Sequence, residues 1–221
     1  MSQEKNDISS LVSKIKIQAR SGVITRREIL QLNSNDYHIS KLIRENFLKP
    51  LVPGIYLLAD FPYPDYLDYI LVSLKLEDPI ICMISALNYH HMTLEFERCI
   101  HVAIPPRGKK VHIAFPPVCY YEYPEKTLEV GVEIINEPGW NIKVFNREKT
   151  LIDCLIFEEI YLEETIFEAF DSYLHYPKKN DPIRLFKYAE QFGVADKLNE
   201  RLLSFASHQE IQIFYSQLKQ K

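Results

Sequence analysis

Apolar residues near the amino terminus recur with helical spacing. In "ISSLVSKIKIQARSG" they fall three, four, seven and eleven positions after the first, which predicts one amphipathic helix. Gly22 follows this stripe and predicts the end of the helix. The residues of the predicted inward face are Ile8, Leu11, Val12, Ile15 and Ala19.

Two short helices are predicted next by their capping residues. Thr25 is a suitable N-cap with Glu28 three positions later, which is the capping-box pattern, and an apolar run follows. After the turn "NSN", either Asn35 or Asp36 is predicted to cap a third helix. The inward face of that third helix is predicted to be Ile39, Leu42 and Ile43.

The pattern then changes to two short strands in "FLKPLVPGIYLLA". Pro53 and Gly54 between them are typical of a type II turn, in which glycine takes the positive φ. Three helices followed by a β-ribbon predict a winged helix-turn-helix over residues 1–60. The proline-rich stretch "DFPYPDY", residues 60–66, disfavours helix and predicts the boundary to a second domain, residues 61–221.

The second domain is predicted to mix an antiparallel sheet with helices, so the expected fold class is α+β. Helices are predicted in "YLDYILVSLKL" and in "PIICMISALNYHHM", where Pro79 would be the first helical residue. Short β-branched runs from "CIHVAIPP" to "NIKVFN" predict the strands, with the basic cluster "RGKK", residues 107–110, at a hairpin tip.

Amphipathic helices are predicted for the remainder of the chain. "REKTLIDCLIF" is expected to begin one with Asp153 off its apolar face. "EETIFEAFDSYLHY", "DPIRLFKYAEQFG" and "ADKLNERLLSFA" predict three more, with stops at Pro177 and Gly193.

The face of the third helix opposite its apolar side indicates a contact with DNA. An α-helix fits the major groove, where Lys and Arg reach base edges or phosphates. Arg26 and Arg27, with the unpaired amide groups of the second helix, would lie over a phosphate strand, and Lys49 on the wing would reach the adjacent backbone. The predicted DNA-binding residues are Arg26, Arg27, Tyr37, His38, Ser40, Lys41, Arg44 and Lys49.

The charge distribution agrees with a polyanion partner for the first domain. Residues 1–54 hold nine Lys and Arg against five Asp and Glu, whereas the whole chain has a net charge of −4. By charge alone, a chance excess on a solvated helix face explains the pattern equally well.

The sequence has no motif for a metal site, a cofactor site or a catalytic centre. The four cysteines are widely separated and are expected to be reduced, buried thiols. No zinc-ligand spacing, phosphate-binding glycine loop or nucleophile motif is present, so we expect no metal, no cofactor and no catalytic residue. No apolar run is long enough to span a bilayer and the first ten residues are polar, which favours a cytoplasmic protein without a membrane partner.

Five segments together resemble one protein family. In order, they are "GVITRREILQL", "ISKLIRENFLKPLVPGIYLL", "ISALNYHH", "IHVAIPP" and "FNREKTLIDCL". In this respect the chain resembles the AbiEi-like antitoxins, which are transcriptional regulators of bacterial type IV toxin–antitoxin (abortive infection) systems. The resemblance covers most of residues 20–200.

The resemblance implies an autorepressor that binds double-stranded operator DNA of its own promoter. It also implies a second domain that counters a nucleotidyltransferase-like toxin, with direct toxin binding left open. Whether the protein binds DNA as a homodimer is open as well. The alternative interpretation is a protein-interaction module, in which the acidic second domain binds a partner protein and the winged helix does not bind DNA.

Overall fold

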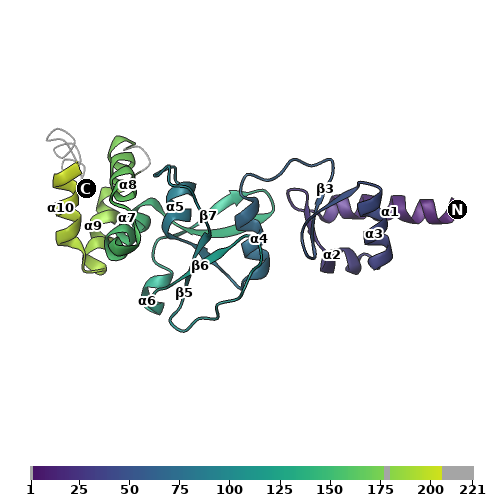
Figure 1. Ribbon diagram of the computed structural model, residues 1–221, viewed down its shortest axis with the longest axis horizontal. Coiled ribbons are helices and arrows are strands. Elements are labelled where there is room, and N and C mark those ends of the chain that lie inside the picture. Colours follow the sequence, from purple (N-terminus) through teal and green to yellow (C-terminus); the bar gives the residue numbers. More distant parts are fainter. Residues whose placement is uncertain (1, 177–179, 206–221) are drawn as a thin grey trace. The chain divides into compact units, whose positions relative to one another are not determined.

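The computed structural model describes residues 2–176 and 180–205, and the chain divides into two compact units (Figure 1). The first unit comprises Met1–Ile70 and Asn136–Asn141, and the second comprises Leu71–Ile135 and Ile142–Lys221. The first unit therefore runs a few residues past the predicted boundary at residues 60–66 and includes a short segment from the second half of the sequence.

The first unit combines three helices with a three-stranded sheet of strand order β1-β3-β2, in which both pairings are antiparallel. Its elements are α1 (Ser2–Gln18), β1 (Val23–Thr25), α2 (Arg26–Gln31), α3 (Asp36–Arg44), β2 (Leu48–Val52) and β3 (Ile55–Leu58). Every one of these elements contributes at least one side chain to a single buried apolar cluster. Strand β1 is too short to have been recognised from its sequence pattern.

The helix caps and the glycine turn predicted for the first unit are confirmed. Thr25 and Glu28 form the full capping box at α2, and Asn35 accepts a hydrogen bond from the His38 amide as the N-cap of α3. Gly54 has a φ of +80° in the turn between β2 and β3. These signals were readable because caps and tight turns depend on residues only a few positions apart.

The segment Asn136–Asn141 contacts Arg20 and Ser21 of the first unit. The Arg20 guanidinium lies 3.9 Å from the centre of the Trp140 ring, and the Trp140 indole donates a hydrogen bond of 3.3 Å to the Arg20 carbonyl oxygen. Ser21 donates a hydrogen bond of 2.6 Å to the carbonyl oxygen of Pro138. No local pattern indicates this association, because the partners are more than one hundred positions apart in sequence.

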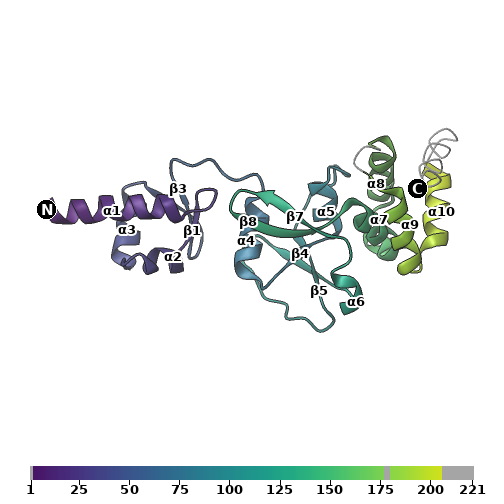
Figure 2. The same cartoon turned by 180° about the vertical axis from the view of Figure 1, so that it is seen from behind.

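The second unit contains a five-stranded sheet of order β6-β5-β4-β8-β7. Helices α7, α8, α9 and α10 gather at one side of this sheet in both views (Figure 1, Figure 2). The elements are α4 (Leu67–Lys75), which begins in the first unit, β4 (Ile80–Ile81), α5 (Met83–Tyr89), β5 (Ile100–Ile104), β6 (Val118–Glu122), α6 (Glu125–Leu128), β7 (Val132–Glu137), β8 (Trp140–Phe145), α7 (Arg147–Ile156), the 3-10 helix η1 (Glu158–Ile160), α8 (Glu163–His175), α9 (Pro182–Gln191) and α10 (Ala195–Phe205).

The predicted helix beginning at Pro79 is wrong at its amino-terminal end. Ile80 and Ile81 instead form the central strand β4, which pairs antiparallel with β5 and parallel with β8, and the helix begins only at Met83. A short apolar run fits either a strand or a buried helix, and here pairing on both edges selects the strand. The sheet is accordingly mixed rather than antiparallel, and with its helices the protein is of the α+β class.

The "RGKK" cluster does not lie at a hairpin tip, because β5 and β6 pair in parallel. Residues 105–117 are therefore a crossover that returns the chain to the start of the neighbouring strand. Within this crossover, Lys110 forms an ion pair of 3.0 Å with Glu122 of β6. Strand β6 then begins at Val118, which pairs with Ile100.

The expectation of four reduced cysteines is also wrong. Cys99 and Cys119 form a disulfide with a Cα–Cα distance of 5.9 Å, whereas Cys82 and Cys154 are buried free thiols. The parallel pairing of β5 and β6 places His101 opposite Cys119, which brings Cys99 within bonding reach. Sequence spacing could not predict this bond, because strand register alone decides which cysteines meet.

The carboxy-terminal helices α8, α9 and α10 agree with their predicted ranges. Gly193 ends α9 with a φ of +70°, as predicted, whereas Pro177 lies outside the described residues. Among residues 2–176 and 180–205, none of the helices is long and apolar enough to cross a membrane.

Candidate nucleic-acid interface

Helix α3 separates its apolar and polar faces as its sequence predicts. Ile39 and Leu42 are buried in the core of the first unit, whereas Tyr37 is 56% exposed. Ser40 and Arg44 are exposed, and Lys41 is half-buried. Because Tyr37, Lys41 and Arg44 are four and three positions apart, they lie along one face of the helix.

His38 lies at the edge of this face and is only half-buried. Its ring centre lies 5.9 Å from that of Tyr37. Its Nδ1 atom is enclosed and has no hydrogen-bond partner among the described residues, so a direct contact of His38 with a ligand would have to use the rest of the ring.

Arg26 is held by an anionic partner within the first unit. Its Nε and Nη2 atoms donate hydrogen bonds of 2.8 and 2.6 Å to the two carboxylate oxygens of Asp36, at the start of α3. This hydrogen-bonded pair lowers the pKa of Asp36 and raises that of Arg26. A phosphate would have to compete with Asp36 for this guanidinium.

The remaining predicted residues lie apart from α3. Arg27 is exposed on α2, and Lys49 is half-buried within β2, opposite Leu57 of β3 rather than at the turn. Two of the α2 amide groups that were expected to be unpaired already have partners. The Arg26 amide donates a hydrogen bond of 2.7 Å to Gly54, and the Glu28 amide bonds the Thr25 hydroxyl.

The second unit holds a cluster of buried charges at the start of α7. Lys149 and Asp153 are fully buried and form an ion pair, and Tyr123 donates a hydrogen bond of 2.8 Å to Asp153. The Lys149 ammonium also lies 4.3 Å from the ring centre of Phe145 and 4.8 Å from that of Phe192. Burial raises the pKa of Asp153, and the adjacent Lys149 opposes this change.

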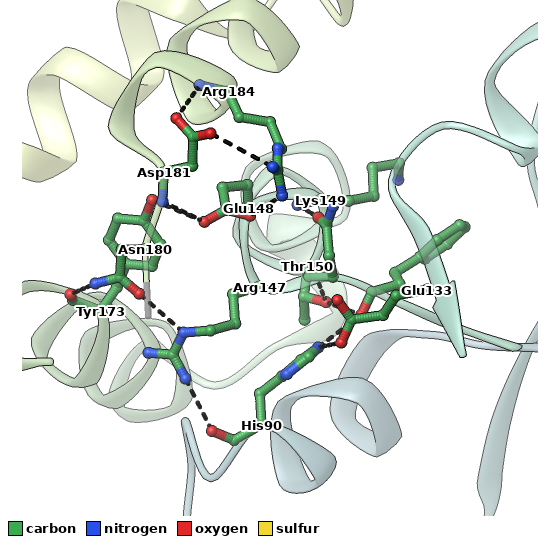
Figure 3. Close-up of polar contacts among 12 residues, drawn as sticks. His90, Glu133, Arg147, Glu148, Lys149, Thr150, Tyr173, Asn180, Asp181 and Arg184 are labelled. Carbon is green, nitrogen blue, oxygen red and sulfur yellow. Dashed lines mark hydrogen bonds and ion pairs between the residues drawn. The ribbon is translucent and has the colours of Figure 1, made fainter. Parts of the chain in front are cut away.

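Arg147 and Glu148 extend this cluster and join separate parts of the unit (Figure 3). Arg147 donates hydrogen bonds of 2.9 Å to the His90 carbonyl oxygen and to the Asn180 side chain. Glu148 accepts hydrogen bonds from the Tyr173 hydroxyl, at 3.1 Å, and from the Asp181 amide, at 2.8 Å. The polar atoms of these side chains are thus used to hold helices and connections together.

Asp153, which was predicted to lie off the apolar face of its helix, is nevertheless buried. Helix α7 packs against α5, α8, α9 and α10, so it has no solvated side along most of its length. The available signal was the spacing of Lys149 and Asp153 at i and i+4, which permits an ion pair but does not reveal its burial. Among the described residues, no group of three or more His, Cys, Asp or Glu side chains is arranged to hold a metal ion.

Comparison with solved structures finds a likeness in fold. The structure resembles the crystal structure of the RV2827C protein from Mycobacterium tuberculosis with a TM-score of 0.59, 13% sequence identity, and coverage of 98% of this chain and 82% of that chain. At this identity the likeness shows a shared fold alone. No protein-family model matches the sequence, and no curated protein matches it.

Proposed function

We propose that the protein is a DNA-binding transcriptional regulator whose first unit is a winged helix-turn-helix. The observation that carries this proposal is the face of α3, where Tyr37, Lys41 and Arg44 line up away from the core. The order of helices and strands supports it, since α3 follows α2 after a short turn and is followed by the antiparallel pair β2 and β3.

In this proposal, the protein is cytoplasmic and binds its own promoter. Helix α3 enters the major groove of that DNA. Lys41 and Arg44 contact base edges or phosphates, Arg27 contacts the phosphate backbone, and the bound protein blocks RNA polymerase. The resemblance to AbiEi-like antitoxins extends the proposal to a type IV toxin–antitoxin system, in which the second unit counters a nucleotidyltransferase-like toxin.

The test is a mobility-shift titration of the protein on DNA from immediately upstream of its gene, with excess unrelated DNA. The double substitution Lys41→Glu/Arg44→Glu is expected to weaken specific binding by roughly 100-fold or more at low salt, since it replaces two attractive contacts with two repulsive ones. Both side chains lie outside the buried core of the unit, so the variant should fold.

The matched control is Lys126→Glu/Lys187→Glu, which makes the same change of net charge at exposed positions of the second unit. It is expected to bind the promoter as the unchanged protein does. An unchanged protein that fails to shift the promoter at low salt contradicts the proposal. Equal losses in both variants would reduce it to non-specific attraction by total charge.

Asp36 is expected to limit DNA affinity, because it occupies the guanidinium of Arg26. Asp36→Asn releases this cation and keeps Asn35 as the helix cap. We expect tighter promoter binding and a salt dependence steeper by about one released counterion, since one more phosphate is neutralised. Affinity measured by fluorescence anisotropy over a series of salt concentrations gives both quantities.

Glu45→Gln is the control for Asp36→Asn, because it removes one negative charge from the other end of α3, where Glu45 is the C-cap. It should leave the slope of log affinity against log salt unchanged. The same slope in both variants and the unchanged protein would show that Arg26 stays off the phosphates.

A further inference from the structure

Residues 93–97, in the segment that follows α5, have an inverted pattern of burial. Leu94 is 93% exposed and Phe96 is 81% exposed, whereas Thr93 between them and α5 is only 7% exposed. Glu95 and Glu97 are both partly buried. Polar side chains thus point inward and large apolar ones outward, the reverse of the usual arrangement at a protein surface.

The inward side chains hold this segment along α8. Thr93 and the Leu94 amide donate hydrogen bonds of 2.6 and 2.9 Å to the carboxylate of Glu168. Thr165, about one turn earlier on α8, donates a hydrogen bond to the carboxylate of Glu95. Two successive turns of the helix therefore secure the residues on both sides of Leu94.

The other end of the segment is secured to α5 and β5. Ser85 donates a hydrogen bond to Glu97 and accepts one of 2.7 Å from the His101 amide, and Asn88 donates one of 3.2 Å to the Glu95 carbonyl oxygen. The disulfide of Cys99 follows directly. Leu94 and Phe96 cannot turn inward without breaking these hydrogen bonds, most of which are partly buried.

We propose that Leu94 and Phe96 form a docking site for a partner protein that offers an apolar groove bordered by Lys and Arg side chains. Exposure of apolar side chains to water is unfavourable, and burial in a partner's apolar groove would remove them from water. Three carboxylates lie in this segment or bind to it, those of Glu95, Glu97 and Glu168. The segment itself holds one positive side chain, Arg98, so its net charge is negative. Lys and Arg side chains at the border of the partner's groove would complement this negative charge.

A second copy of this chain fits this surface poorly. A two-fold contact through Leu94 and Phe96 would bring Glu95 and Glu97 against their own equivalents, which repel. The proposal is independent of DNA binding, since the segment lies wholly in the second unit.

The test uses a displayed library of short random peptides, selected on the full-length protein. Peptides that combine Lys or Arg with aromatic or aliphatic residues should be enriched, and their affinity should fall with added salt. Leu94→Ser/Phe96→Ser is expected to weaken their binding about tenfold or more, because it removes both apolar anchors. Thermal unfolding of the variant should match that of the unchanged protein, since both side chains are exposed.

Ile17→Ser/Leu203→Ser is the matched control, because it removes two other large apolar side chains that are 85% and 66% exposed. It should bind the selected peptides as the unchanged protein does. Failure to enrich any peptide, enrichment of acidic peptides, or equal binding by Leu94→Ser/Phe96→Ser overturns the proposal. Self-association in sedimentation velocity that this variant abolishes would also overturn it, by assigning the segment to a second copy. Promoter binding, measured on the same variants, should stay unchanged.

Discussion

Replacing Lys149 with methionine is expected to lower the free energy of unfolding by about 3 to 5 kcal/mol. The substitution leaves the fully buried Asp153 without its cation, and the hydrogen bond from Tyr123 remains to stabilise the carboxylate. A charge left unpaired in a buried position is costly, because water no longer solvates it. Chemical denaturation followed by circular dichroism measures the change.

Two features distinguish this explanation from a simple loss of packing. The double variant Lys149→Met/Asp153→Leu removes both charges and should recover most of the lost stability. The single variant should lose less stability at acidic pH than at neutral pH, because burial raises the pKa of Asp153 and the neutral acid carries no unpaired charge. A cost of less than about 1 kcal/mol at neutral pH would show that the pair is solvated.

Acidification from about pH 7 to about pH 4 should cost about 3 kcal/mol of stability through His101 alone. Burial lowers the pKa of His101 from 6.5 to about 4, so the unfolded chain takes up a proton on this side chain at a higher pH than the folded protein does. The contribution is complete above the unfolded pKa and is lost as pH falls from about 6.5 towards 4.

The environment of His101 explains why its ring stays neutral. It stacks on Tyr121 with 5.3 Å between ring centres, and its Nδ1 atom is buried without a hydrogen-bond partner among the described residues. His101→Phe keeps an aromatic ring there and should flatten the pH dependence of the unfolding free energy. His112→Phe, at an exposed position, is the control and should leave that dependence unchanged. Equal slopes in all three proteins would contradict the assignment to His101.

The first unit shows how far local sequence signals reach. The capping box at Thr25, the cap at Asn35 and the turn at Gly54 were all predictable, and so was the apolar face of α3. Each depends on residues within one or two turns of one another, so neighbours in sequence already carry the physical cause. The arrangement of the candidate interface on α3 follows from these signals. The ion pair that occupies Arg26 does not, because it joins two helices.

The second unit depends on contacts between distant residues, which only the tertiary structure decided. Pairing on both edges made Ile80 and Ile81 a strand, and the register of β5 with β6 joined Cys99 to Cys119. Helix packing on all sides buried Lys149 and Asp153. The sequence by itself determined most of the helices, the caps of α2 and α3 and the α+β class. The strand partners, the disulfide and the burial of charges depend on which segments, far apart in sequence, pack together and exclude water. No local sequence pattern encodes that choice.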